Sequence, residues 1–179
     1  MDFNNSKTKK NLENAFIGES KARNKYTFYS KKAHEDGFIQ IAKIFEETAN
    51  NEKEHAKIWF KLLNDNKINS TKENLKDAIE SEDFEYTSMY KEYSITAKEE
   101  GFEDISRFFE SVRQIEKSHR DRYIKLLYNL ENDEMYKKEM EVIWRCSKCG
   151  NQNFSKVAPK ICPVCKHPQG YFEINNDKF

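Results

Sequence analysis

The stretches Glu52-Lys53-Glu54-His55 and Glu116-Lys117-Ser118-His119 decide which fold this sequence predicts. Each has the form Glu-x-x-His and lies in a long run without glycine or proline, which favours an α-helix. Residues three apart share one face of a helix, so each stretch directs a carboxylate and an imidazole toward the same point. This pair of donors is typical of sites for redox iron or manganese, and in some proteins for zinc.

A repeat links the two stretches. The segment 29–38 recurs at 93–102, an offset of 64 residues, and the same offset places the first Glu-x-x-His motif on the second. Upstream of these segments the offset is one residue shorter, and Glu19 then corresponds to Glu82. This period is longer than those of solenoid repeats and suits a duplicated helical hairpin.

The repeat predicts four helices. A glycine divides each copy at a helix C-terminal position, Gly37 in the first and Gly101 in the second, where left-handed backbone is favoured. A long crossover near 64–72 would join the two hairpins, and the fold class is an all-α, ferritin-like four-helix bundle. The predicted helices cover residues 7–34, 39–65, 73–99 and 102–130.

The candidate ligands lie on the stripe of each helix that is expected to be buried. Apolar residues from Phe38 to Leu62 keep spacings of three and four, and Glu52 and His55 fall on the same stripe. Charged residues there are costly unless they are paired or bind metal. A two-metal bundle site needs a further carboxylate from each of the other two helices. The six ligands predicted in this way are Glu19, Glu52, His55, Glu82, Glu116 and His119.

The four cysteines form two Cys-x-x-Cys pairs with twelve residues between them: Cys146, Cys149, Cys162 and Cys165. This spacing predicts a tetrahedral four-thiolate site, and the cysteines alone favour zinc over a single iron. The N-terminal residues show no signal peptide, so we expect a reducing compartment and no disulfides.

The order of the candidate ligands resembles rubrerythrin. Glu82 is followed by Glu85 in the pattern Glu82-x-x-Glu85-Tyr86-Thr87-x-Met89-Tyr90, and the extra carboxylate Glu85 marks that family. The tail, with Trp144 before the cysteines and Tyr171-Phe172-Glu173 after them, resembles its rubredoxin-like domain. This implies a ferritin-like bundle over 1–135, a linker over 136–141, and a small rubredoxin-like domain of β-strands and metal-bound knuckles over 142–179.

The resemblance also implies roles for individual residues. Glu52 and Glu116 would bridge two irons, while Glu19 and Glu82 would bind them terminally. Glu85 and His55 would exchange at one iron as its oxidation state changes, because Fe(III) favours an extra anionic oxygen. Two tyrosines would hydrogen-bond the ligand carboxylates. These are Tyr26 and Tyr90.

The implied function is a non-haem di-iron peroxidase that reduces hydrogen peroxide to water in oxidative-stress defence. Glu52, Glu85 and His55 would be its catalytic residues. Electrons from an NAD(P)H-dependent reductase or a rubredoxin would pass through iron at the four cysteines, in a cytoplasmic homodimer. Asn151 and Lys166 depart from the usual rubredoxin pattern and leave zinc open at that site.

Two other functions remain open from the sequence. A ferritin-like protein would use the same di-iron ligands to oxidise Fe(II), and a non-enzymatic scaffold would pair a bundle with a zinc ribbon. Lys and Arg number 31 and Asp and Glu also number 31, so net charge gives no reason to expect nucleic acid or a membrane surface as a partner. The mean hydropathy of −0.99, with no long apolar run, argues against a transmembrane helix.

Overall fold

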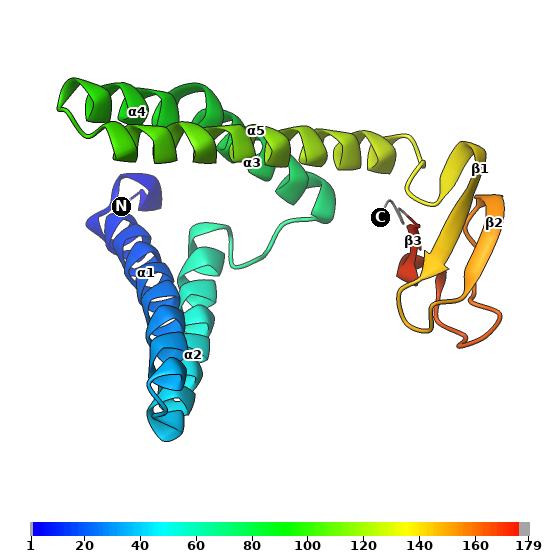
Figure 1. Ribbon diagram of the computed structural model, residues 1–179, viewed down its shortest axis with the longest axis horizontal. Helices are drawn as coiled ribbons and strands as arrows, with labels where there is room; N and C mark the ends of the chain where they lie inside the picture. The colour runs from blue at the N-terminus through cyan, green and yellow to red at the C-terminus, as the bar shows by residue number, and fades with distance from the viewer. Residues whose placement is uncertain (1, 176–179) are drawn as a thin grey trace. The chain divides into compact units, whose positions relative to one another are not determined.

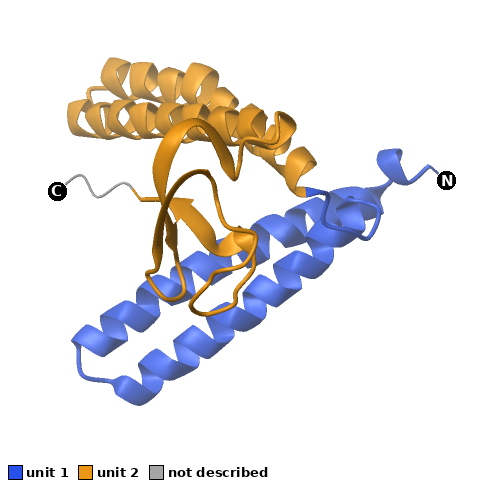
Figure 2. Ribbon diagram, turned by 90° about the vertical axis from the view of Figure 1, so that its right-hand side faces the viewer, with its two compact units in different colours: residues 1–70 blue, residues 71–179 orange. Residues whose placement is uncertain are grey.

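The chain forms two helical hairpins followed by a small three-stranded module (Figure 1). The computed structural model describes residues 2–175, and the chain divides into two compact units at the boundary between Ser70 and Thr71 (Figure 2). The prediction of an all-α part with four helical stretches, followed by a small four-cysteine module, is confirmed. No helix within residues 2–175 is long and apolar enough to cross a membrane.

The first unit is a hairpin of α1 (Lys7–Glu35) and α2 (Ile39–Leu63), preceded by the short 3-10 turn η1 (Phe3–Asn5). Helix α1 begins after Ser6, whose hydroxyl oxygen accepts a hydrogen bond from the backbone N–H of Lys9 at 3.1 Å. This cap satisfies one of the four N–H groups that a helix N-terminus leaves without a partner.

The two hairpin turns have the same backbone geometry. Gly37 and Gly101 adopt φ angles of 82° and 84°, in the left-handed region. In each turn the next residue donates its N–H to the carbonyl five residues earlier, at 2.8 Å from Phe38 and 2.7 Å from Phe102. Both turns are therefore Schellman caps, and both glycines were predicted at these helix ends.

The second unit contains the other hairpin. Helix α3 (Thr71–Phe84) continues through a π-helical turn, η2 (Glu85–Met89), into α4 (Tyr90–Glu99). All three segments pack against α5 (Glu103–Glu131). The sequence predicts one regular helix over 73–99, and the π turn is the difference from that prediction.

Aromatic packing repeats between the two hairpins. The rings of Tyr26 and Tyr29 lie 6.1 and 5.6 Å from the ring of Phe45. The second hairpin has matching distances of 6.0 and 5.6 Å among Tyr90, Tyr93 and Phe109. The duplication seen in the sequence is therefore also a duplication of side-chain packing.

The π turn explains why the repeat offset changes by one residue. Glu19 corresponds to Glu82 at an offset of 63, whereas Tyr26 corresponds to Tyr90 at an offset of 64. The second copy thus holds one additional residue between these positions, and η2 lies there. A π turn accommodates an inserted residue because its hydrogen bonds span five residues rather than four.

The C-terminal module is a three-stranded antiparallel sheet in the order β2-β1-β3. Its strands are β1 (Lys137–Cys146), β2 (Gln152–Val157) and β3 (Phe172–Ile174), and a 3-10 turn, η3 (Gln169–Tyr171), precedes β3. Five buried residues form its core, which are Trp144, Cys146, Ala158, Cys162 and Phe172. Strand β1 begins within the segment 136–141 that was predicted as a linker. The predicted domain limits stay a prediction. Their outer ends, Met1 and 176–179, lie outside the described residues.

Candidate metal centres

The first hairpin brings three of the predicted ligands together. Glu19 comes from α1, while Glu52 and His55 come from successive turns of α2, and their ligand atoms lie within 4.8 Å of one another. The Nδ1 atom of His55 lies 2.9 Å from a carboxylate oxygen of Glu52 and 3.8 Å from one of Glu19. Two carboxylates and an imidazole form a mixed oxygen and nitrogen donor set suited to iron, manganese or zinc.

The second hairpin holds the equivalent cluster. Glu82 comes from α3, and Glu116 and His119 come from α5. The Nδ1 atom of His119 lies 2.7 Å from a carboxylate oxygen of Glu116 and 3.6 Å from one of Glu82. All six ligands predicted from the repeat therefore fall into two clusters with the same composition and similar distances.

The electrostatics of the second cluster fit a cation. Burial, a hydrogen bond with Glu116 and the negative charge of Glu116 raise the pKa of Glu82 above its ordinary value. The pKa of Glu85 is also raised, by burial and then by the charge of Glu116. Carboxylates that disfavour one another's ionisation would be stabilised as anions by a bound metal ion.

Glu85 lies outside the three-residue clusters but close enough to interact with one of them. It opens the π turn and is half-buried, and its pKa responds to both Glu116 and His119. Without the turn, the following residues would lose their match to the first hairpin. The second copy therefore has an additional carboxylate, Glu85, at the start of the π turn, and the residues after the turn keep their match to the first copy.

The two predicted tyrosines occupy equivalent positions in the hairpins. The pKa of Tyr90 is raised by burial and by the charges of Glu85 and Glu116, which indicates that its hydroxyl lies near these carboxylates. Tyr26 packs against Tyr29 and Phe45. Its role beside the ligands stays a prediction.

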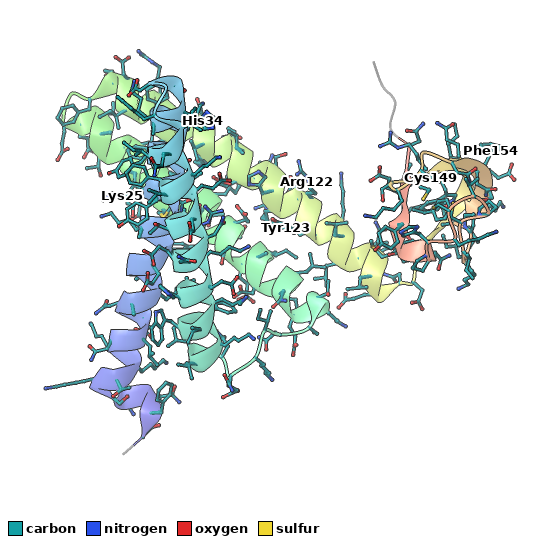
Figure 3. The ribbon with its side chains drawn as sticks, turned by 90° about the horizontal axis from the view of Figure 1, so that it is seen from below. Lys25, His34, Arg122, Tyr123, Cys149 and Phe154 are labelled. Carbon is teal, nitrogen blue, oxygen red and sulfur yellow. The ribbon has the colours of Figure 1, made fainter. Side chains whose placement is uncertain are left out.

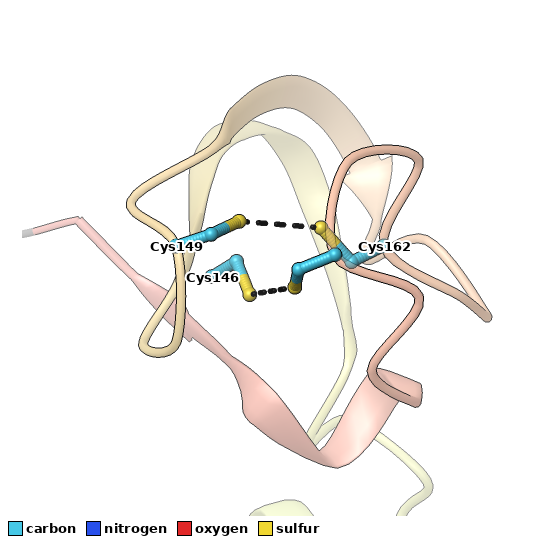
Figure 4. Close-up of side chains that lie close together, drawn as sticks. Cys146, Cys149 and Cys162 are labelled. Atoms are coloured by element: carbon cyan, nitrogen blue, oxygen red, sulfur yellow. Dashed lines mark hydrogen bonds between the residues drawn. The ribbon is translucent and has the colours of Figure 1, made fainter.

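The four cysteines form the third cluster, and none of them is in a disulfide (Figure 4). The Sγ atoms of Cys146 and Cys165 are 3.7 Å apart, and those of Cys149 and Cys162 are 3.6 Å apart. A tetrahedral site with metal–sulfur bonds of about 2.3 Å has sulfurs roughly 3.8 Å apart. The cluster therefore has the dimensions of a four-thiolate metal site.

The thiols are also arranged to be ionised in part. A hydrogen bond from the backbone of Cys165 and another from Val164 lower the pKa of Cys162 to about 6, against an opposing effect of burial. The backbone of His167 lowers the pKa of Cys165, but burial and the neighbouring sulfurs outweigh it and raise that pKa to about 12. Four sulfurs so close cannot all ionise without a cation, and a divalent or trivalent metal would provide that charge.

Access to this site differs among the sulfur ligands. Cys146 and Cys162 are buried in the module. Cys149, which is labelled in Figure 3, is exposed. Lys148, next to Cys149, places its ammonium 5.1 Å from the ring centroid of Tyr171. One edge of the four-cysteine site thus faces solvent beside a positive charge.

Sequence reasoning missed the π turn and the two arginines that contact it, Arg113 and Arg120. Two signals were present in the sequence. One was the change of offset between Glu19 and Tyr26, and the other was the replacement of small residues by arginine in the second copy of the repeat.

Comparison with known proteins gives two family matches that together span most of the chain. A model described as rubrerythrin matches residues 10–127, and a model described as the rubrerythrin rubredoxin-like domain matches residues 144–173. The chain is 41% identical to rubrerythrin-1 of Clostridium acetobutylicum, covering 97% of each chain. It is 43% identical to a rubrerythrin of Porphyromonas gingivalis, covering 94% of this chain and 90% of the relative. A solved structure titled as partially reduced nigerythrin aligns with a TM-score of 0.37 at 27% identity, over 95% of this chain and 87% of that one.

Proposed function

This chain belongs to the rubrerythrin family, and on that premise we propose that it is a non-haem di-iron peroxidase that reduces hydrogen peroxide to water. The observation that carries the proposal is the presence, in one chain, of two matched Glu/Glu/His clusters and a four-thiolate site. The first two offer ligands for redox iron, and the third offers a route for electrons.

We assign the ligands of two irons to the two hairpin clusters together with Glu85. The four-cysteine site would take a third iron, and its geometry would also accept zinc. The ligands assigned to the two irons are Glu19, Glu52, His55, Glu82, Glu85, Glu116 and His119.

The reaction consumes two electrons and two protons for each peroxide, and its products are two molecules of water. When bound, the two irons would supply the two electrons, and iron at the four cysteines would replace them one at a time. Glu85 offers an anionic oxygen and His55 a neutral nitrogen, so exchanging these ligands changes the charge of the site by one unit. That exchange lets the protein match its ligand charge to the oxidation state of the metal.

The carboxylates also offer a place for a proton. Without a bound metal ion, burial and the hydrogen bond with Glu116 favour the protonated form of Glu82, because they raise its pKa, whereas a bound cation would favour the ionised form. A ligand carboxylate that holds a proton can release it when its surroundings become more positive. Glu52 has the position in the first hairpin that corresponds to Glu116, and it is the ligand that we assign to proton transfer.

Electrons would enter at the exposed edge of the cysteine site, near Cys149. The donor that we propose is an NAD(P)H-dependent reductase or a rubredoxin. We further propose that the protein acts as a homodimer in the cytoplasm, where thiols stay reduced and a thiolate site is not lost to disulfide formation.

The proposal is tested by rapid mixing. The purified chain would be loaded with iron, its iron content measured, and the reduced protein mixed separately with hydrogen peroxide and with oxygen. We expect about three irons per chain, as the ligand sets imply, and oxidation by peroxide at least about tenfold faster than by oxygen, a difference of about 1.4 kcal/mol in activation free energy.

The other functions predict different results. Faster oxidation by oxygen, with iron accumulating beyond the assigned sites, would identify an iron-oxidising protein of ferritin type. A colourless protein that retains only zinc would instead identify a non-enzymatic scaffold. The double variant Glu52→Gln with Glu116→Gln is the matched control, because it removes one carboxylate from each cluster and should abolish oxidation by peroxide.

A further inference from the structure

The π turn leaves one backbone acceptor in an unusual position. The N–H of Tyr90 donates to the carbonyl of Glu85, five residues earlier. In an α-helix that N–H would be directed to the carbonyl of Tyr86 instead. In this protein Nε of Arg113, on the neighbouring helix α5, donates to the Tyr86 carbonyl oxygen at 2.8 Å. A side chain of another helix thus donates a hydrogen bond to the Tyr86 carbonyl, which does not accept the N–H of Tyr90 as it would in an α-helix.

The side chain of Tyr86 is held as well as its carbonyl. The guanidinium carbons of Arg113 and Arg120 lie 5.0 and 4.9 Å from the centroid of its ring, within the range of a cation–π interaction. Arg120 also donates to a carboxylate oxygen of Asp83 at 2.7 Å. The two arginines therefore contact the segment from Asp83 to Tyr86, which includes Glu85.

Arg113 is itself fixed in place. Its Nη1 donates to both carboxylate oxygens of Glu110, at 3.1 and 2.9 Å, and only 22% of its side chain is exposed. Since Nε donates to the Tyr86 carbonyl and Nη1 to Glu110, two nitrogens of the planar guanidinium are held, and this fixes its orientation. The side chain of Arg113 is therefore held in one position beside the π turn and is not a mobile charge on the surface.

The repeat shows what the arginines replace. At the offset of 64, Arg113 corresponds to Ala49 and Arg120 to Ala56. Both alanines are buried, with 0% and 8% of their surface exposed, and they lie in the hairpin whose first helix, α1, is unbroken. The hairpin with a π turn has arginines where the hairpin without one has buried alanines.

We propose that Arg113, supported by Arg120, is a positioning residue that holds the π turn and so fixes the direction in which Glu85 projects. The inference rests on the proposed role of Glu85 as an iron ligand. The hydrogen bonds that the described residues show for Arg113 go to the Tyr86 carbonyl and to Glu110, not to an assigned ligand atom. Arg113 instead holds the backbone next to Glu85, the residue whose carboxylate we assign as a ligand.

The first test measures the turn itself, by hydrogen exchange with mass spectrometry on the full-length chain with and without iron. In Arg113→Ala we expect exchange in the peptide covering 83–91 to become about tenfold faster, because a charge-assisted hydrogen bond is lost. The equivalent peptide of α1 should not change. Arg107→Ala is the control, since Arg107 lies on the same helix but is exposed and pairs with Asp104.

The second test separates positioning from general stability through a double-mutant cycle. Arg113→Ala should slow oxidation of the reduced protein by peroxide about tenfold, the effect typical of losing a group that orients a ligand. Added to Glu85→Gln, the same substitution should slow it by less than about twofold, because the group that it positions is already altered. Arg113→Lys retains the positive charge but not the planar guanidinium with its several N–H donors, so it should restore only part of the rate.

Several results would overturn the inference. Unchanged exchange at 83–91 in both Arg113 variants would show that the arginine does not hold the turn, whatever reaction the protein catalyses. Equal slowing of the wild-type and Glu85→Gln backgrounds would show a purely structural role. If Glu85→Gln alone leaves peroxide oxidation unchanged, the proposed function of Glu85 fails, and the exchange result then still decides whether the arginine holds the turn. Should Arg113→Ala fail to fold, both comparisons are made with Arg113→Lys.

Discussion

Single residues give the two hairpins different chemistry. The clusters have the same composition, but Glu85 has no acidic counterpart, because the equivalent positions in α1 are Lys21 and Ala22. Tyr90, which follows the turn, has its pKa raised by burial and then by the charge of Glu85. We expect the two irons to differ in ligand charge for this reason.

Glu85→Gln keeps the shape of the side chain and removes its negative charge. We expect iron content to stay the same, because the clustered ligands remain. Oxidation by peroxide should slow about 100-fold, or about 2.7 kcal/mol, as expected for a charged group that acts mainly in the oxidised state. Metal analysis and stopped-flow absorption would measure the two effects. An unchanged rate would contradict ligand exchange between Glu85 and His55, and Glu92→Gln in α4 is the control.

At this scale the sequence was sufficient to predict which side chains cluster, both the six Glu and His residues of the hairpins and the four cysteines. Their metal binding stays a prediction. The repeat pairs Glu52 with Glu116 and His55 with His119, and this pairing indicated a shared role for them. The expected burial is not seen at every position, since 51% of the His55 side chain is exposed. The sequence was insufficient for Arg113, since arginine on a helix is usually a solvated residue. Only the hydrogen bond to the Tyr86 carbonyl shows what it contacts.

Helices of the first hairpin are packed through small residues. Ala42, Ala49 and Ala56 recur every seven residues along α2, and each is buried. Small side chains at a helix contact let the two backbones approach closely. In α5 the corresponding positions hold Ser106, Arg113 and Arg120, so the two hairpins use different contacts.

Ala49→Leu should therefore destabilise the first hairpin. Alanine at this position has no exposed surface, and a larger side chain must displace its neighbours at a cost of about 1–3 kcal/mol. Thermal unfolding followed by circular dichroism would measure the loss. Asn50→Leu, at an exposed position on the same helix, is the control and should change stability by less than about 0.5 kcal/mol. Equal stability of both variants would contradict tight packing at Ala49.

At the level of elements, the sequence predicted the helix ends better than the helix interiors. Gly37 and Gly101 marked two Schellman caps because only a left-handed residue suits that position. The π turn was missed, since residues from Glu85 to Met89 have ordinary helix propensities and its cause is an added residue rather than an unfavourable one. Strand β1 extends over Lys137 to Glu141, where the charged residues had indicated a linker rather than a strand.

At the scale of the whole molecule, the proposed function requires a site for peroxide and a separate site for electrons. Cys146→Ser should abolish steady-state turnover with an external donor, because it removes one thiolate of the relay. A single oxidation of fully pre-reduced protein by peroxide should continue at the wild-type rate. Donor-dependent assays and single-turnover mixing would distinguish the two, with Ser147→Ala as the control between the paired cysteines. Normal donor-dependent turnover in Cys146→Ser would exclude the tail as the relay.

Metal removal should affect the small module more than the hairpins. Its core has only five buried residues, among them Trp144 with 1% of its surface exposed, so a bound metal should contribute much of its stability. In a Trp59→Phe background, a strong chelator should shift the fluorescence of Trp144 to longer wavelength while far-ultraviolet dichroism retains its helical signal. A fluorescence spectrum that chelation leaves unchanged would show that the module folds without metal.

The π turn also has a consequence for how such a molecule changes over evolutionary time. One residue inserted into an α-helix would rotate everything beyond it by about 100° and move its buried face toward solvent. Here the extra residue is contained within η2, and Tyr90 and Tyr93 pack on Phe109 as their counterparts do in the other copy. A single added codon could therefore make a symmetric ancestral pair of hairpins asymmetric while the rest of the duplicated copy kept its inherited contacts.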